Sequence, residues 1–170
     1  MKNLAFKYGI ISSAVMCTMV VIPLFIWETP AENKYGEVLG YAAMILALTA
    51  IYFGIKEYKA ELEGELSFKQ AFIFGTFVNF VAALAFGIFS YALYAWLMPD
   101  FLQQYLDHSI AKVMTDTSLT ESERATQIKF INDREDFFLS PALGGLLMFG
   151  TVFPIGLVMT LISSFALKSK

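Results

Sequence analysis

Four long apolar runs alternate with charged segments along the chain. The runs cover about residues 8–27, 36–55, 71–98 and 140–167. At about 1.5 Å per residue, a helix of this length crosses a hydrocarbon core of about 30 Å. Each run should end at a membrane surface, because hydrocarbon excludes the charged segments. The pattern therefore predicts an all-α integral membrane four-helix bundle, with residues 1–170 forming a single four-span domain.

The sharpest change in polarity lies between the second and third runs. Half of the residues in the connector 56–69 are charged, whereas the flanking runs are nearly free of charge. Gly64 suits a helix C-terminal cap with positive φ, and Ser67 has the spacing of a capping box that starts the third helix. A solvated connector explains these charges as well as a binding surface does. The candidate interaction surface comprises Lys56, Glu57, Tyr58, Lys59, Ser67 and Lys69.

Small residues recur every three or four positions in the second and third runs. This spacing places them on one side of each helix, where another backbone can approach closely. We expect the two stripes to pack within the bundle, and a homodimer seam is the alternative. The first stripe comprises Gly36, Gly40, Ala43, Ala47, Ala50 and Gly54, and the second Gly75, Asn79, Ala83, Gly87 and Ser90.

The ends of the spans carry further signals. Trp27 closes the first run, which is too long for the apolar core of a secretory signal and is therefore predicted to be an uncleaved helix. Tyr91, Tyr94 and Trp96 predict an aromatic belt at the end of the third run. Pro154 predicts a kink in the last run.

The segment 100–139 is the longest polar stretch. Apolar residues at helical spacing predict an amphipathic helix over 100–114. Two overlapping capping boxes, which begin at Ser118 and Thr120, predict a second helix that reaches about Leu139. We expect a helical hairpin that caps the bundle or lies on the membrane.

The distribution of charge predicts the orientation. The net charge of -3 is too small to suggest nucleic acid as a partner. Eleven of the fifteen acidic residues lie in 28–37 and 100–136. The opposite side is rich in lysine close to the span ends, so both termini should be cytoplasmic. These lysines are Lys2, Lys7, Lys56, Lys59, Lys69, Lys168 and Lys170.

Motifs that carry chemistry are absent from the sequence. It has no glycine-rich phosphate loop, CxxC pair or nucleophile elbow, and its single cysteine, Cys17, excludes an intrachain disulfide. His108 beside Asp107 is a weak metal motif that a solvated helix face explains better. No Asp, Glu, Lys, Arg or His lies deep in the spans, where coupled transporters usually need an ionisable side chain. We expect no catalytic, cofactor-binding or metal-ligating residues, and no enzymatic activity.

Several short motifs carry a family resemblance. They are Phe53-Gly54-Ile55-Lys56-Glu57-Tyr58-Lys59, Leu66-Ser67-Phe68-Lys69-Gln70-Ala71-Phe72 with Gly75, Met98-Pro99-Asp100-Phe101, and Phe153-Pro154-Ile155-Gly156-Leu157 with Leu161-Ile162-Ser163. Through them the chain resembles the domain of unknown function 4199 family, small four-span bacterial membrane proteins. The resemblance implies a location in the bacterial inner (cytoplasmic) membrane. It implies no activity and no cofactor.

These features favour a binding role. We expect a non-enzymatic scaffold, subunit or envelope-associated accessory protein that contacts the lipid bilayer and a protein partner or a second copy of itself. The alternative is a small-molecule or lipid transporter that works as an oligomer. Asn79, the most polar residue of the second stripe, would then line the path.

Overall fold

The computed structural model describes residues 1–26 and 36–169, and every regular element within these ranges is helical. The expected acidic turn at 28–35 and the Trp27 anchor lie outside the described residues. The elements, in chain order, are α1 (Lys2–Ile26), α2 (Gly36–Glu61), α3 (Phe68–Ala92), η2 (Leu93–Leu97), α4 (Phe101–Thr115), α5 (Glu121–Asn132), α6 (Glu135–Phe138) and α7 (Pro141–Leu167).

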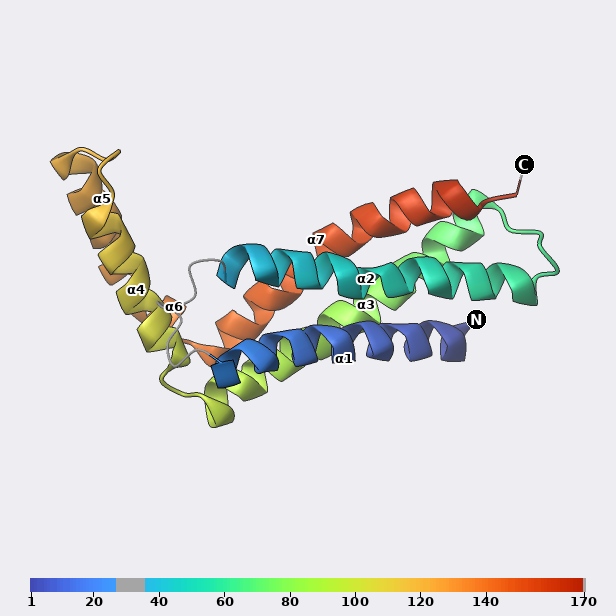
Figure 1. Ribbon diagram of the computed structural model, residues 1–170, viewed down its shortest axis with the longest axis horizontal. Coiled ribbons are helices and arrows are strands. Elements are labelled where there is room, and N and C mark those ends of the chain that lie inside the picture. The colour runs from blue at the N-terminus through green and yellow to red at the C-terminus, as the bar shows by residue number, and fades with distance from the viewer. Residues whose placement is uncertain (27–35, 170) are drawn as a thin grey trace.

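The helices α1, α2, α3 and α7 form a bundle, and α3 contributes most to its hydrophobic core. The helices follow the order α1, α2, α7, α3 around the bundle, α2 and α3 also touch across its middle, and the most extensive interface joins α3 to α7. The core between them includes Leu48, Ile51, Phe74 and Val78, all fully or almost fully buried. Both described ends of the chain lie at one end of the bundle, together with the α2–α3 connector (Figure 1).

The four expected spans are present as helices. Among the described residues, four helical segments are long and apolar enough to cross a membrane, and they cover Lys2–Ile22, Val38–Glu61, Phe68–Leu97 and Pro141–Leu167. This confirms the all-α bundle of membrane type. The first helix begins before residue 8 and the second continues past residue 55, because Lys, Glu and Ala sustain a helix beyond its apolar portion.

The caps predicted at the connector form, and the start of α7 is also capped. Gly64 has a φ of 92°, and its N–H donates to the Lys59 carbonyl. The Ser67 hydroxyl accepts from the Gln70 N–H, while the Gln70 side chain accepts from the Ser67 N–H, which completes the capping box. Ser140 caps α7, and Pro141 occupies its first turn. These local signals set the helix ends as expected.

The end of the third span differs from the simple aromatic belt. The chain forms one π-helical turn, η2, which changes the direction in which successive side chains face. Trp96 is 73% exposed, whereas Tyr94 is buried and stacks on Phe101 at 5.5 Å between ring centroids. Tyr94 is therefore a packing residue at the base of the polar segment.

The polar segment forms an arm, which we define as α4, α5 and α6. Figure 1 shows α4 and α5 beyond the end of the bundle, at a steep angle to α1 and α2. The prediction of a continuous second helix to Leu139 is wrong, because α5 ends at Asn132 and α6 begins at Glu135. Asn132 and Asp133 are poor helix formers, so interrupting the helix at these residues costs little free energy.

Only one of the two predicted capping boxes in the arm forms. Thr120 and Glu123 make the reciprocal pair of hydrogen bonds that starts α5. Ser118 instead donates its hydroxyl and its N–H to Asp116 at 2.6 and 2.8 Å. Ser118 binds the Asp116 carboxylate instead of capping the helix, because this nearer acceptor closes a two-residue turn ahead of α5.

Candidate functional site

The middle of the bundle contains one buried amide. Asn79 on α3 is fully buried, and its Nδ2 donates to the Phe153 carbonyl on α7 at 2.8 Å. That carbonyl immediately precedes Pro154, which lacks an N–H and therefore removes one hydrogen bond from α7. α7 nevertheless continues through Pro154 to Leu167. The Asn79 side chain thus joins α3 to α7 beside the proline.

Glycine at position 156 creates the space that Asn79 occupies. A Cβ added at Gly156 would lie 1.8 Å from Asn79 Oδ1, which no side chain can tolerate. The same interface is close elsewhere, since a Cβ at Gly75 would lie 2.7 Å from Thr160 Cγ2 and one at Gly145 would lie 2.7 Å from the Gly87 carbonyl oxygen. The second stripe, including Ala83 and Ser90, is buried. Its expected packing within the bundle is present.

The first stripe is divided between a packed half and an open half. Ala47, Ala50 and Gly54 are buried, and a Cβ at Gly54 would lie 3.0 Å from the Tyr8 ring. Ser12 on α1 donates to the Ala47 carbonyl at 2.9 Å. Gly40 has no atom within 4 Å of an added Cβ, and Ala43 is half-buried. Gly36 begins α2, but its surroundings lie outside the described side chains.

Four buried polar atoms have no hydrogen-bond partner in the described part of the chain. They lie on the two helices that form the main interface and include the Oδ1 of the Asn79 amide. Such groups are costly in an apolar interior, so each of them adds polarity to the side of its helix on which it lies. The four atoms are Thr76 Oγ1, Asn79 Oδ1, Thr160 Oγ1 and Ser164 Oγ.

The candidate interaction surface at 56–69 is partly used by the fold itself. Glu57 accepts from the Tyr8 hydroxyl and pairs with Lys7 Nζ at 3.0 Å. Tyr58 is buried and stacks on Phe74 at 4.6 Å between centroids. Ser67 serves as the helix cap described above.

Three lysines of this predicted surface face outwards. Lys56 and Lys69 are exposed, and Lys59 is half-buried. The structure thus separates the six residues into three that hold the connector in place and three whose charges remain at the surface. The exposed lysines are the part of the predicted surface that another molecule can reach.

A latch that the sequence does not reveal fastens the C-terminal end of the chain to the connector. The Ser169 N–H donates to the Leu66 carbonyl at 2.8 Å, and the Ser169 hydroxyl accepts from the Leu66 N–H at 2.9 Å and donates to the Gly64 carbonyl at 2.7 Å. Leu66 is buried. No local motif encodes this contact, because the partners are more than one hundred residues apart.

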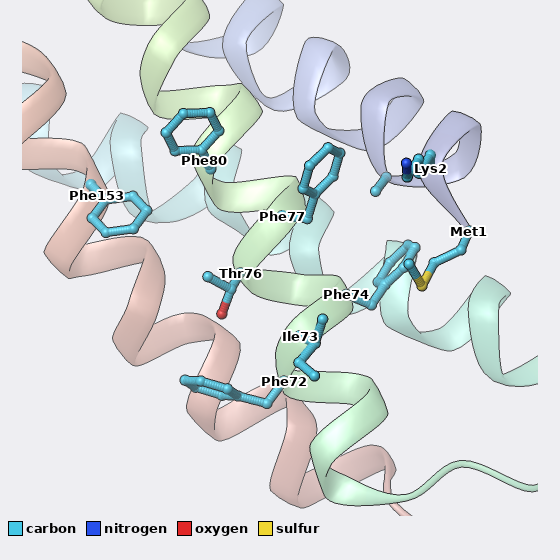
Figure 2. A pocket seen from close by; sticks show the side chains of 10 residues that line it. Met1, Lys2, Phe72, Ile73, Phe74, Thr76, Phe77, Phe80 and Phe153 are labelled. Carbon is cyan, nitrogen blue, oxygen red and sulfur yellow. The ribbon is translucent and has the colours of Figure 1, made fainter.

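An apolar groove of about 420 Å³ lies on the outer side of α3. Figure 2 shows Phe77 on the side of Lys2 and α1, and Phe72 and Phe153 on the side of α7. Lys2 provides the only charged side chain among the lining residues, and Thr76 the only hydroxyl. The spacing of residues in the sequence shows which of them share a face of α3. It does not show that α1 packs beside α3, so the groove could not be predicted.

The arm touches the bundle through its base. Leu102 lies 3.8 Å from where a Cβ of Gly144 would be, and the Tyr94–Phe101 stack joins η2 to α4. Several large apolar side chains of the arm are exposed. These are Tyr105, Met114, Phe130 and Phe137.

Polar groups of the arm form local contacts. His108 is half-buried on α4, whereas Asp107 accepts from Gln103 and not from the histidine. Within the described residues, no three His, Cys, Asp or Glu side chains lie together as a metal site would require. The hydrogen bond from the Ser118 hydroxyl lowers the pKa of the Asp116 carboxyl, and that from the Thr120 hydroxyl lowers the pKa of Glu123.

Comparison with known proteins identifies a family but no activity. No curated protein and no solved structure matches the chain. One family model, described as "Protein of unknown function (DUF4199)", matches residues 7–169. The match includes all four spans, the connector and the arm. The chain therefore belongs to the DUF4199 family.

Proposed function

We propose that this chain is a non-enzymatic, multi-pass protein of the bacterial inner membrane that acts by binding a protein partner. It serves as a scaffold, a subunit or an envelope-associated accessory protein. The observation that carries the proposal is the arm, which projects from the bundle while keeping large apolar side chains exposed. The arm is the principal contact surface, and the lysines at the connector are a second one.

The exposed side chains and the charge of the arm match a partner protein that presents both apolar and basic groups. Met114 on α4 is 56% exposed, and Phe130 on α5 is 51% exposed. Exposed aromatic and methionine side chains are enriched at protein interfaces. The segment 100–139 also contains eight acidic residues against four Lys and Arg residues. A surface of this charge favours association with a basic partner and disfavours anionic lipid.

The charge at the opposite end of the bundle supports an orientation. The N-terminal residues, the connector and the C-terminal residues lie together there and carry Lys2, Lys7, Lys56, Lys59, Lys69 and Lys168 (Figure 1). Under the positive-inside rule, this end is cytoplasmic and the arm is extracytoplasmic. The proposed partner is therefore a protein of the envelope, on the outer side of the membrane.

The interior of the bundle favours binding over transport. Glycine contacts close the α3–α7 interface, and the groove lies on the outer side of α3. Transport remains the second candidate, because the buried Asn79 amide lies beside Pro154 in α7 and its Oδ1 has no hydrogen-bond partner among the described residues. Broken helices with polar groups at mid-membrane are typical of transporter sites.

Affinity purification from native membranes tests the arm. In one variant, Tyr105, Met114, Phe130 and Phe137 are each changed to Gln, while a control carries Gln103→Ala and Gln127→Ala on the same arm. The native chain and the control should retain the same stoichiometric protein, measured by mass spectrometry, and the four-residue variant should lose it. Equal recovery with all three chains would refute the role of the arm. Loss only in a Lys56→Gln and Lys69→Gln variant would reassign contact to the connector.

A flux measurement separates the second candidate. Asn79→Leu removes the amide from the α3–α7 interface and leaves the arm intact. A binding protein with this variant should keep its partner, provided that the variant remains folded by its thermal unfolding profile. A changed solute flux in reconstituted vesicles, with partner recovery unchanged, would instead support transport through this interface.

A further inference from the structure

The groove on the outer side of α3 has the shape and lining of a site for an acyl chain. Ile73, Phe77 and Phe80 follow one face of the helix at spacings of four and three residues, and all three are exposed. The face is about 10 Å long at the helical rise. Ala5 on α1 and Phe153 on α7 help to line it (Figure 2). Its volume of about 420 Å³ is that of a small-molecule pocket.

Positive charge gathers at the end of this groove. Lys2 lines it, and its ammonium group forms no ion pair with another described residue. α1 and α3 pack side by side and both begin at this end of the bundle (Figure 1). The first turn of each helix contains no acidic residue, so the partial positive charge of both N-termini adds to that of Lys2. Lys69, in the first turn of α3, is also exposed.

This combination of charge and apolar surface points to one occupant. We infer that the groove binds a single anionic phospholipid, with its phosphate at Lys2 and one acyl chain along Ile73, Phe77 and Phe80. A soluble anion would leave the apolar walls uncovered. A bilayer presents a phosphate and an acyl chain together at this level of a spanning helix.

The inference does not depend on the proposed function. The groove is built from α1, α3 and α7, whereas the proposed protein contact uses the arm. If the groove bound no lipid, the arm variants would still be expected to lose the protein partner. If the arm bound no partner, the groove would still be expected to bind lipid. The two experiments therefore fail separately.

Tryptophan quenching by brominated lipid tests the site. Trp27→Phe and Trp96→Phe remove the native fluorophores, and Phe77→Trp places one in the groove. The matched control is Val158→Trp on α7, which is exposed and lies at the same level because Gly156 contacts Asn79 and Thr160 contacts Gly75. The vesicles contain brominated phosphatidylglycerol or brominated phosphatidylcholine with identical chains.

The groove variant should bind the anionic lipid more strongly than the zwitterionic lipid, on the order of fivefold for one lysine near the surface. Lys2→Gln should remove this preference, Lys56→Gln on α2 should preserve it, and the Val158→Trp control should show none. Equal quenching by both lipids at the groove, or a preference that survives Lys2→Gln, would overturn the inference. Phe80→Trp provides a second groove reporter if Phe77→Trp does not fold, and the same outcomes apply.

Discussion

Packing between α3 and α7 depends on single residues that must be small. Gly156 is the strictest case, because the Asn79 amide occupies the position of its missing side chain. The donor of that amide in turn binds the carbonyl next to Pro154. The glycine, the asparagine and the proline therefore act as one unit, in which a change at one position alters the requirement at the others.

Gly156→Ala should destabilise the bundle by about 1–3 kcal/mol, because overpacking forces α3 and α7 apart. Gly150→Ala on the same helix is the control, since an added Cβ there meets nothing within 4 Å. It should be neutral or slightly stabilising, because alanine favours a helix. Thermal unfolding in detergent micelles measures both.

Adding Asn79→Ala to Gly156→Ala tests the cause of the clash. The double variant should regain part of the lost stability, since the amide no longer occupies the space. If the double variant were as unstable as the sum of the two single variants, the proposed coupling between Asn79 and Gly156 would be wrong.

At the scale of elements, the sequence predicted what depends on neighbouring residues. The Ser67 and Thr120 capping boxes and the positive φ of Gly64 follow from a few adjacent positions. The break between α5 and α6 was missed, because the apolar spacing continues through Asn132 and Asp133. Tyr94 was assigned to the belt, because periodicity assumes α-helical turns and cannot anticipate a π turn.

The candidate site could be predicted only in part, because its contacts join helices that are far apart in the sequence. The spacing of Gly75, Asn79 and Gly87 identified a packing face, but it did not identify Gly156 as the partner of Asn79. Likewise, Lys7 and Glu57 come together only because α1 and α2 are antiparallel neighbours. The groove requires three helices in a defined order.

The start of α5 should loosen in acid. Hydrogen bonds in the folded chain lower the pKa of both Asp116 and Glu123, so these carboxylates stabilise the fold at pH values above their unfolded pKa of about 4. This contribution is lost as the pH falls through the lower folded pKa. Hydrogen-exchange protection factors for the amides of α5, compared between pH 6 and pH 3, should decrease.

Glu123→Gln is the matched variant for this measurement. Glutamine retains the acceptor that the capping box needs but does not titrate. The variant should keep α5 formed at pH 6 and show a smaller decrease in acid. A decrease equal to that of the native chain would exclude Glu123 as a source of the pH dependence.

The whole molecule has two chemically different ends. One end holds the connector, the latch at Ser169 and most of the lysines, and the other holds the arm with most of the acidic residues. The rim of the bundle between them is apolar and exposed, as lipid contact requires. This asymmetry underlies the proposed orientation.

Thiol labelling of intact cells tests that orientation. A cysteine introduced at Ala60 in the connector should resist a membrane-impermeant reagent, while one introduced at Ser122 in the arm should react, in a Cys17→Ser background. Both positions are exposed, so burial does not explain protection. Permeabilised cells, in which both should react, are the control. The reverse pattern in intact cells would invert the topology.

The hydrogen bond between Asn79 and Phe153 also bears on biogenesis. Its two partners are separated by 74 positions, and the acceptor lies on α7, which leaves the ribosome after α3. Until that helix enters the bilayer, the amide of α3 has no acceptor there, and the glycine face around it meets lipid or an insertion factor instead. This bundle therefore cannot complete its α3–α7 interface before α7 is inserted, and a chain truncated before α7 should be retained by the insertion machinery or degraded.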